Sequence, residues 1–213
     1  MIGVIRVFTT EDEKILNHHG EIISERYGVS TVSKCITDQP YGVFNDETEK
    51  TAVPKIIQLG KKMEQEGCKV LVISCAADPA IEELRKEVTI PVIGAGSAAA
   101  LSALAIGQSV GVLGITDEVP LAIKKLLGEL LISYQKVQGI GNTTDLLTPS
   151  GRQQGVAAAK DFVDRGAKVI LFACTGFSTI GLSNLIRQDL PVPIIDAVDA
   201  AGLFASAFYS DQS

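Results

Sequence analysis

Short, almost wholly apolar runs alternate along the chain with longer stretches in which apolar residues recur at helical spacing. The apolar runs predict strands covered on both faces at Ile2–Phe8, Ser30–Cys35, Val70–Ser74, Val92–Ile93, Ser109–Ile115, Val169–Ala173 and Ile194–Ile195. The stretches between them predict helices at Glu11–Tyr27, Glu47–Glu66, Pro79–Val88, Ser97–Ile106, Pro120–Leu131, Ser150–Arg165, Ser178–Asp189 and Ala200–Tyr209. Regular alternation of strand and helix is typical of parallel sheets, so the pattern predicts an α/β fold.

The two halves of the chain resemble each other. The segment from Gly67 to Cys75 has the same spacing of glycine, apolar run and cysteine as the segment from Gly166 to Cys174. We interpret this as a duplication. It predicts two pseudo-symmetric domains, each a parallel sheet flanked by helices, with the active site in the interdomain cleft. We expect the first domain at residues 1–96 and the second at 97–198, with 199–213 returning to the first.

One segment, Val88–Thr116, lacks charged residues and is long enough to span a bilayer. Pro91 and several glycines interrupt it, so we predict a strand, a small-residue helix and a second strand instead. We expect the small-residue helices Ala98–Ile106 and Ala200–Phe208 to be buried between the domains or at a dimer contact. We also expect a homo-oligomer.

Composition and charge narrow the classes of partner. The formal net charge is −6, Lys and Arg form no run, aromatic residues make up 5% and Trp is absent. These features argue against nucleic-acid and membrane partners, so we expect a small-molecule substrate. The chain opens directly on a strand without the pattern of a signal peptide, which predicts a cytoplasmic protein. Four cysteines without a CxxC pair indicate neither a metal site nor a redox motif.

Two of these cysteines are candidates for chemistry. Cys75 and Cys174 each end an apolar strand, and ligands bind at the carboxyl ends of parallel strands. A helix start close behind each thiol predicts a lowered pKa and N–H groups that bind a substrate oxyanion. Two opposed thiols suit inversion of a stereocentre beside a carbonyl, because one removes a proton and the other delivers one to the opposite face, without a cofactor.

Simpler interpretations stand beside this one. A single cysteine at a strand end is most often a small buried hydrophobe, and it is the symmetric pair that favours function. Cys35 and Cys68 are interpreted as structural. The adjacent His18 and His19 point to different faces of a helix, lack metal-ligand spacing and are interpreted as ordinary helix residues.

Helix capping and packing explain three further features. Asp78 is predicted to cap a helix that starts at Pro79, and Asp196 or Asp199 to cap the last helix. The glycine-rich turn Gly94–Ala99 resembles a dinucleotide-binding turn, but no convincing acidic residue ends the next strand. We therefore assign its glycines to close helix–sheet packing.

The segments Ile73–Pro79, Pro91–Gly94 and Ala173–Gly176 resemble the aspartate/glutamate racemase superfamily, and above all its hydantoin racemase branch with the allantoin racemases beside it. Weaker support comes from Gly3–Ile5 and the turn Gln39–Gly42. The resemblance implies an isomerase that uses neither pyridoxal phosphate nor a metal, with Cys75 and Cys174 as catalytic residues. It implies substrate contacts from Thr9, Thr10, Tyr41, Gly42, Ala76, Ala77, Asp78, Gly94, Thr116, Thr175 and Gly176.

The chain departs from that family at the residues after each cysteine. Glutamate racemases carry Cys-Asn-Thr and Cys-Thr-His there, whereas this chain has Cys75-Ala76-Ala77 and Cys174-Thr175-Gly176. The missing Asn and His favour a ring such as a 5-substituted hydantoin, or a related amino-acid derivative, over free glutamate. The alternatives are an aspartate/glutamate-type racemase, a maleate isomerase-like enzyme or a non-enzymatic protein that binds a small ligand; two cysteines weigh against an arylmalonate decarboxylase-like enzyme.

Overall fold

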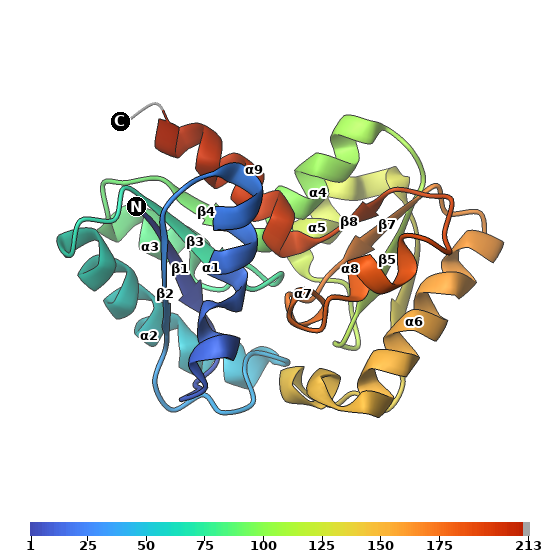
Figure 1. Cartoon of the computed structure of the whole chain (residues 1–213), viewed down its shortest axis with the longest axis horizontal. Coiled ribbons are helices and arrows are strands. Elements are labelled where there is room, and N and C mark those ends of the chain that lie inside the picture. The colour runs from blue at the N-terminus through green and yellow to red at the C-terminus, as the bar shows by residue number, and fades with distance from the viewer. Residues whose placement is uncertain (211–213) are drawn as a thin grey trace.

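The computed structural model describes residues 1–210 and contains two four-stranded parallel sheets flanked by helices (Figure 1). The first sheet has the strand order β2-β1-β3-β4 and the second has the order β6-β5-β7-β8. The elements of the first half are β1 (Ile2–Arg6), α1 (Glu13–Tyr27), β2 (Thr31–Cys35), α2 (Asp46–Gln65), β3 (Val70–Ser74), α3 (Ile81–Glu87), β4 (Val92–Gly94) and α4 (Ala95–Ile106). Those that follow are β5 (Val110–Gly114), α5 (Leu121–Leu127), η1 (Gly128–Leu130), β6 (Leu131–Lys136), η2 (Thr143–Leu147), α6 (Pro149–Asp164), β7 (Val169–Phe172), α7 (Gly176–Thr179), α8 (Leu182–Ile186), β8 (Ile194–Ile195) and α9 (Ala197–Ser210).

The two sheets have the same strand connectivity. β1 lies between β2 and β3 with β4 outside β3, and β5 lies between β6 and β7 with β8 outside β7. Every residue of β1, β3, β5 and β7 is buried, because helices cover these central strands. The prediction of an α/β protein with two matching parallel sheets is confirmed, and the matching order agrees with an internal duplication.

Strand β6 is absent from the sequence prediction, which placed a helix as far as Leu131. The helix α5 ends at Leu127 because Gly128 leaves the helical region with φ 51° and ψ −123°. β6 is a half-buried edge strand that contains Ser133 and Gln135, so it lacks the apolar run that marks the other strands. The predicted helix from Ser178 to Asp189 is also divided, into α7 and α8, at Gly181 with φ 64°.

Helices rich in alanine fill the space between the sheets. α4 contacts β3 and β4 of the first sheet and β7 and β8 of the second, and it packs along α9. Its buried face approaches the backbone so closely that a Cβ on Gly96 would lie 2.1 Å from the carbonyl oxygen of Ala76. Of the two alternatives for these helices, burial between the domains is confirmed for α4.

Helix α9 returns toward the first sheet and packs against α1, β1, β3 and β4 (Figure 1). Asp196 caps this helix by accepting a hydrogen bond from the Val198 N–H at 2.9 Å, as one alternative predicted.

Because α4 contacts both sheets, the boundary between the domains at residues 96 and 97 stays a prediction. Residues 211–213 of the predicted returning segment lie outside the described residues. Within residues 1–210 no helix has the length and apolarity needed to cross a bilayer.

Candidate active site

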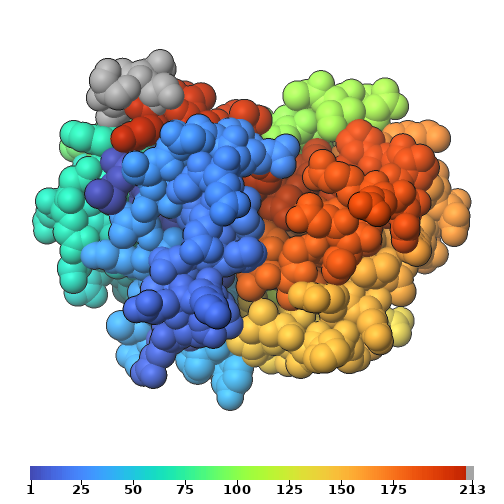
Figure 2. Space-filling view, in the orientation of Figure 1, coloured from blue at the N-terminus to red at the C-terminus, as the bar shows by residue number. Residues whose placement is uncertain are grey.

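A cavity between the two domains lies at the carboxyl ends of the central strands, and both Cys75 and Cys174 border it. Cys75 follows β3 directly, and Cys174 lies two residues beyond the end of β7. The two thiols therefore come from equivalent positions of the two domains, where parallel sheets bind ligands. The surface view shows the two domains in contact along a seam, with the blue first domain against the orange part of the second (Figure 2).

Both thiols are nearly sealed from solvent, with 8% of Cys75 and 7% of Cys174 exposed. Burial raises the pKa of the Cys174 thiol to about 11, although the N–H groups of Gly176 and Phe177 oppose the rise. Burial raises the pKa of Cys75 further, opposed by the Ala77 N–H and reinforced by the nearby Cys174, Asp78 and Glu49. The expected lowering of both pKa values is wrong in its net direction, because desolvation outweighs the hydrogen bonds that favour the thiolate.

Several predicted substrate contacts also border the cavity: Gly42, Ala76, Ala77, Thr116, Thr175 and Gly176. Thr175 links the domains, since its Oγ1 donates to the Ser74 carbonyl at 3.1 Å. A Cβ on Gly176 would lie 3.3 Å from the Cys174 sulfur and 2.7 Å from Cδ1 of Leu146, so glycine keeps space beside the thiol. Thr116 is held by Tyr134, whose hydroxyl donates to the Thr116 carbonyl at 2.7 Å.

Other predicted contacts do not border the cavity. Thr9 Oγ1 donates to the Ile36 carbonyl at 2.7 Å and accepts from the Gln39 N–H at 2.8 Å, which holds the loop after β2. Thr10 Oγ1 accepts from the Asp12 N–H, Tyr41 is 59% exposed, and Gly94 lies at the start of α4. Thr9, Thr10 and Tyr41 lie in loops and Gly94 ends β4, and none of the four is part of the cavity wall.

Asp78 caps a different helix from the predicted one. Its carboxylate accepts hydrogen bonds from the N–H groups of Gly96 and Ser97, each at 2.7 Å, and from the Ser97 hydroxyl. The helix that follows Asp78 in sequence begins at Ile81 without a side-chain cap. Asp78 thus ties the loop after Cys75 to the first turn of α4, and it is not among the residues that border the cavity.

His18 and His19 lie in α1 as interpreted, but the contact of His19 with the second domain was not predicted. Its buried imidazole lies within 2.7 Å of Ser74 Oγ through Nδ1 and within 2.8 Å of Thr179 Oγ1 through Nε2. Burial, with the nearby positive charge of Arg6, holds the pKa of His19 well below its ordinary value. The spacing of Ile15, His19 and Ile23, four residues apart, is the signal that places His19 on the buried face of α1.

Arg6 is a second residue that the sequence reasoning missed. It is 3% exposed, borders the cavity and lies at the end of a buried strand. A charged residue inside an otherwise apolar strand is the signal that could have identified it.

Thr143 and Thr144 of η2 also border the cavity from the second domain. Within the described residues, no group of three or more His, Cys, Asp or Glu is arranged to hold a metal ion.

The model of the Asp/Glu/hydantoin racemase family matches residues 28–203 of the chain. The chain belongs to the Asp/Glu/hydantoin racemase family. It is therefore an isomerase of the racemase type, as predicted. A hydantoin racemase from Pseudomonas sp. (strain NS671) is 28% identical over 181 residues, which cover 78% of this racemase and 68% of the relative.

Solved structures confirm the two-domain fold of this racemase. An allantoin racemase from Klebsiella pneumoniae superposes with a TM-score of 0.81 at 18% identity, over 99% of this chain and 88% of that one. An allantoin racemase from Pseudomonas fluorescens superposes with a TM-score of 0.79 at 22% identity, over 99% of this chain and 91% of that one.

Proposed function

We propose that this racemase inverts the stereocentre of a 5-substituted hydantoin, or of a related amino-acid derivative, by proton transfer between the thiols of Cys75 and Cys174. The observation that carries the proposal is that two thiols from equivalent strand ends border one buried cavity. The carbon to be inverted lies beside a ring carbonyl, which makes its hydrogen acidic enough for removal by a thiolate.

In one direction a thiolate takes the hydrogen from carbon, and the electron pair passes to the carbonyl oxygen as an enolate. The opposite thiol then gives its proton to the other face of the carbon, so the two sulfurs exchange protonation states. Cys174 has the lower pKa of the two, because the N–H groups of Gly176 and Phe177 both oppose the effect of burial. It is therefore the first to form the thiolate in the free enzyme.

The cavity wall offers a mainly apolar surface with a few polar groups, which suits a compact ring. Phe8, Val43, Ile115 and Leu147 supply apolar surface, whereas Thr116, Thr143 and Thr144 supply hydroxyl groups. Two solved relatives are named for racemisation of allantoin, and a curated relative is named for hydantoin. Both names support a cyclic ureide as the substrate class of this chain.

The decisive experiment follows optical rotation and hydrogen exchange together in deuterated water. We expect a panel of single-enantiomer hydantoins, including allantoin, to lose rotation and to gain one deuterium at the stereocentre. Cys75→Ala and Cys174→Ala should each lower the racemisation rate by at least ~1000-fold, since each removes one of the two proton carriers.

Exchange without inversion is the signature of a single remaining thiol. Each single variant should therefore still exchange hydrogen on one enantiomer only, and the two variants should prefer opposite enantiomers. Cys68→Ala, at a buried thiol that does not border the cavity, is the matched control and should keep full activity. Full racemisation by Cys75→Ala or Cys174→Ala would refute the two-thiol mechanism.

A further inference from the structure

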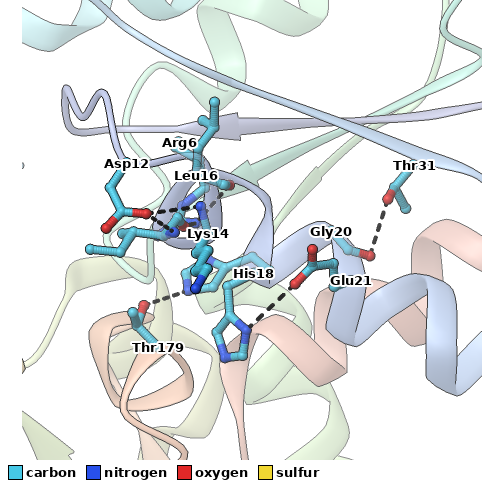
Figure 3. A network of polar contacts seen from close by, with 11 residues as sticks. Arg6, Asp12, Lys14, Leu16, His18, Gly20, Glu21, Thr31 and Thr179 are labelled. Atoms are coloured by element: carbon cyan, nitrogen blue, oxygen red, sulfur yellow. Dashed lines mark hydrogen bonds and ion pairs between the residues drawn. The ribbon is translucent and has the colours of Figure 1, made fainter.

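The cavity contains a buried positive charge that the two-thiol reaction does not use. Arg6 ends β1 and lies beside the first turns of α1, where its Nη1 donates to the carbonyls of Ile15 at 2.6 Å and Leu16 at 3.0 Å (Figure 3). Its Cζ lies 5.0 Å from the centre of the Phe8 ring, which supports a cation without neutralising it. The side chain is therefore fixed from two sides while it borders the cavity.

No carboxylate among the described residues forms an ion pair with Arg6, which is unusual for a buried guanidinium. Within residues 1–210, Nε and Nη2 of Arg6 also have no hydrogen-bond partner. Among the described residues, the fully buried side-chain nitrogen and oxygen atoms that lack a hydrogen-bond partner are Ser133 Oγ and Gln135 Oε1, and no atom of Arg6 is among them. The free N–H groups of Arg6 are thus open to the cavity.

Such an arrangement is costly unless an anion completes it. Burial lowers the pKa of Arg6 to about 9, an effect that Cys35 opposes slightly. A guanidinium with one edge occupied and the other open presents the paired donors that bind a carboxylate in two parallel hydrogen bonds. An anion with the geometry of a carboxylate would fit these donors.

We infer that Arg6 binds a carboxylate on the substituent of the substrate, so that this racemase prefers hydantoins with an acidic side chain. The inference rests on the proposed function and specifies its substrate class. The carboxylate would bring the missing negative charge into the cavity, and the interaction would fix the ring relative to the two thiols.

The position of Arg6 assigns it to the substituent instead of the reacting carbon. In the parallel sheet Arg6 pairs with Ser74, the residue before Cys75. Side chains alternate along a strand, so Arg6 and Ser74 share one face of the sheet, whereas Cys75 packs with Ile5 and Val7 of the other face. The charges that act on Cys75 come from Cys174, Asp78 and Glu49, and Arg6 is not among them. Arg6 therefore lies to one side of the sulfurs.

The test compares two substrates of the same shape, 5-(2-carboxyethyl)hydantoin and its uncharged carboxamide, in wild type, Arg6→Lys and Arg6→Met. We expect wild type to favour the acid in kcat/KM by roughly 10- to 100-fold, the range of a hydrogen-bonded charge pair. Arg6→Met should lose this preference, so that the ratio of its kcat/KM values for the acid and the carboxamide falls to about one, and Arg6→Lys should keep part of the preference.

Equal kcat/KM values for acid and carboxamide in wild type would overturn the inference. An equal loss on both substrates in Arg6→Met would also overturn it, since that result assigns Arg6 only to support of α1 through Ile15 and Leu16. If Arg6→Met does not fold, the preference of wild type and its reduction in Arg6→Lys decide the matter.

A binding measurement separates this inference from the proposed function. If neither hydantoin is racemised, the proposed function fails, and calorimetric titration of the enzyme with succinate and with succinamide tests Arg6 alone. Succinate binding that is lost in Arg6→Met, with no binding of succinamide, would support the carboxylate site. Absence of succinate binding to wild type would contradict it.

Discussion

At the scale of single residues, the two thiols are under opposing influences. Burial disfavours the thiolate at both positions, whereas N–H groups from the turns after each cysteine favour it. The balance leaves both thiols protonated near neutral pH, with Cys174 closer to ionisation than Cys75. A ligand changes this balance if it places positive charge near a sulfur or excludes the remaining water. The reactivity of the two thiols therefore depends on what occupies the cavity.

Alkylation as a function of pH tests this order of acidity. We expect iodoacetamide to label Cys174 faster than Cys75 at every pH between about 7 and about 10, with both rates still rising at the upper limit, because both pKa values lie above the ordinary value of about 8.5. Peptide mapping by mass spectrometry assigns each rate. The half-buried Cys35 provides an internal reference for a thiol outside the cavity. A rate plateau below about pH 8 at Cys75 or Cys174 would contradict the raised values.

Elements differ in how much of their position the sequence determines. The central strands are predictable because burial on both faces demands continuous apolar runs, as in Val70–Ser74 and Val169–Phe172. The edge strand β6 is exposed on part of its surface and carries polar residues, so periodicity cannot distinguish it from a helix end.

The part of the candidate site that lies at strand ends could be predicted from the sequence. Cys75 and Cys174 follow from the rule that ligands bind at the carboxyl ends of parallel strands. Asp78 and His19 have partners on elements that are not adjacent in sequence, namely α4 and α7, and Arg6 has its partners on α1. Local capping rules assign Asp78 to the nearest helix, and only the packing of α4 against the loop after Cys75 reveals the true partner.

Asp78 connects the loop after β3 to the start of α4. Its carboxylate satisfies two N–H groups at the start of α4, a helix without a cap of its own. We expect Asp78→Ala to lower the free energy of unfolding by about 2–3 kcal/mol, the combined cost of a lost cap and of buried unpaired donors. Urea denaturation at neutral pH measures the loss.

The control for that variant is Asp12→Ala, which removes an exposed cap from α1. This change should cost about 1 kcal/mol, because water replaces the lost hydrogen bonds at an exposed helix end. Equal losses of unfolding free energy in the two variants would mean that burial of the Asp78 cap adds nothing to stability. Asp78→Ala should also slow racemisation, since it releases the loop that carries the Ala77 N–H beside Cys75.

At the scale of the whole molecule, polar contacts join the two domains on one side of the cavity. His19 on α1 connects Ser74, which ends β3, with Thr179, which ends α7. The Thr175 hydroxyl adds a second connection to the Ser74 carbonyl. A neutral imidazole can serve two hydroxyl groups at once because each hydroxyl can donate or accept. Protonation of His19 would remove its acceptor and place a second positive charge near Arg6.

This contact predicts how stability depends on pH. The pKa of His19 is lowered in the folded protein, so the unfolded chain binds more protons below the ordinary histidine value of about 6.5. The stability that His19 contributes is therefore complete above about pH 6.5 and declines as pH falls, by at most about 1.4 kcal/mol per pH unit. Urea denaturation from about pH 5 to about pH 7.5 should show this decline in wild type and a smaller one in His19→Gln.

The difference between the two proteins isolates His19 from other buried acids. Burial raises the pKa of Asp78 and Asp196, which gives stability the opposite slope at acidic pH, but both residues are present in each protein and their effects cancel. His18→Gln removes a half-exposed imidazole from the same helix and is the matched control. A decline that vanished equally in both variants would assign the effect to α1 as a whole. A decline lost only in His19→Gln ties the pH response of the fold to the contact that joins its two domains.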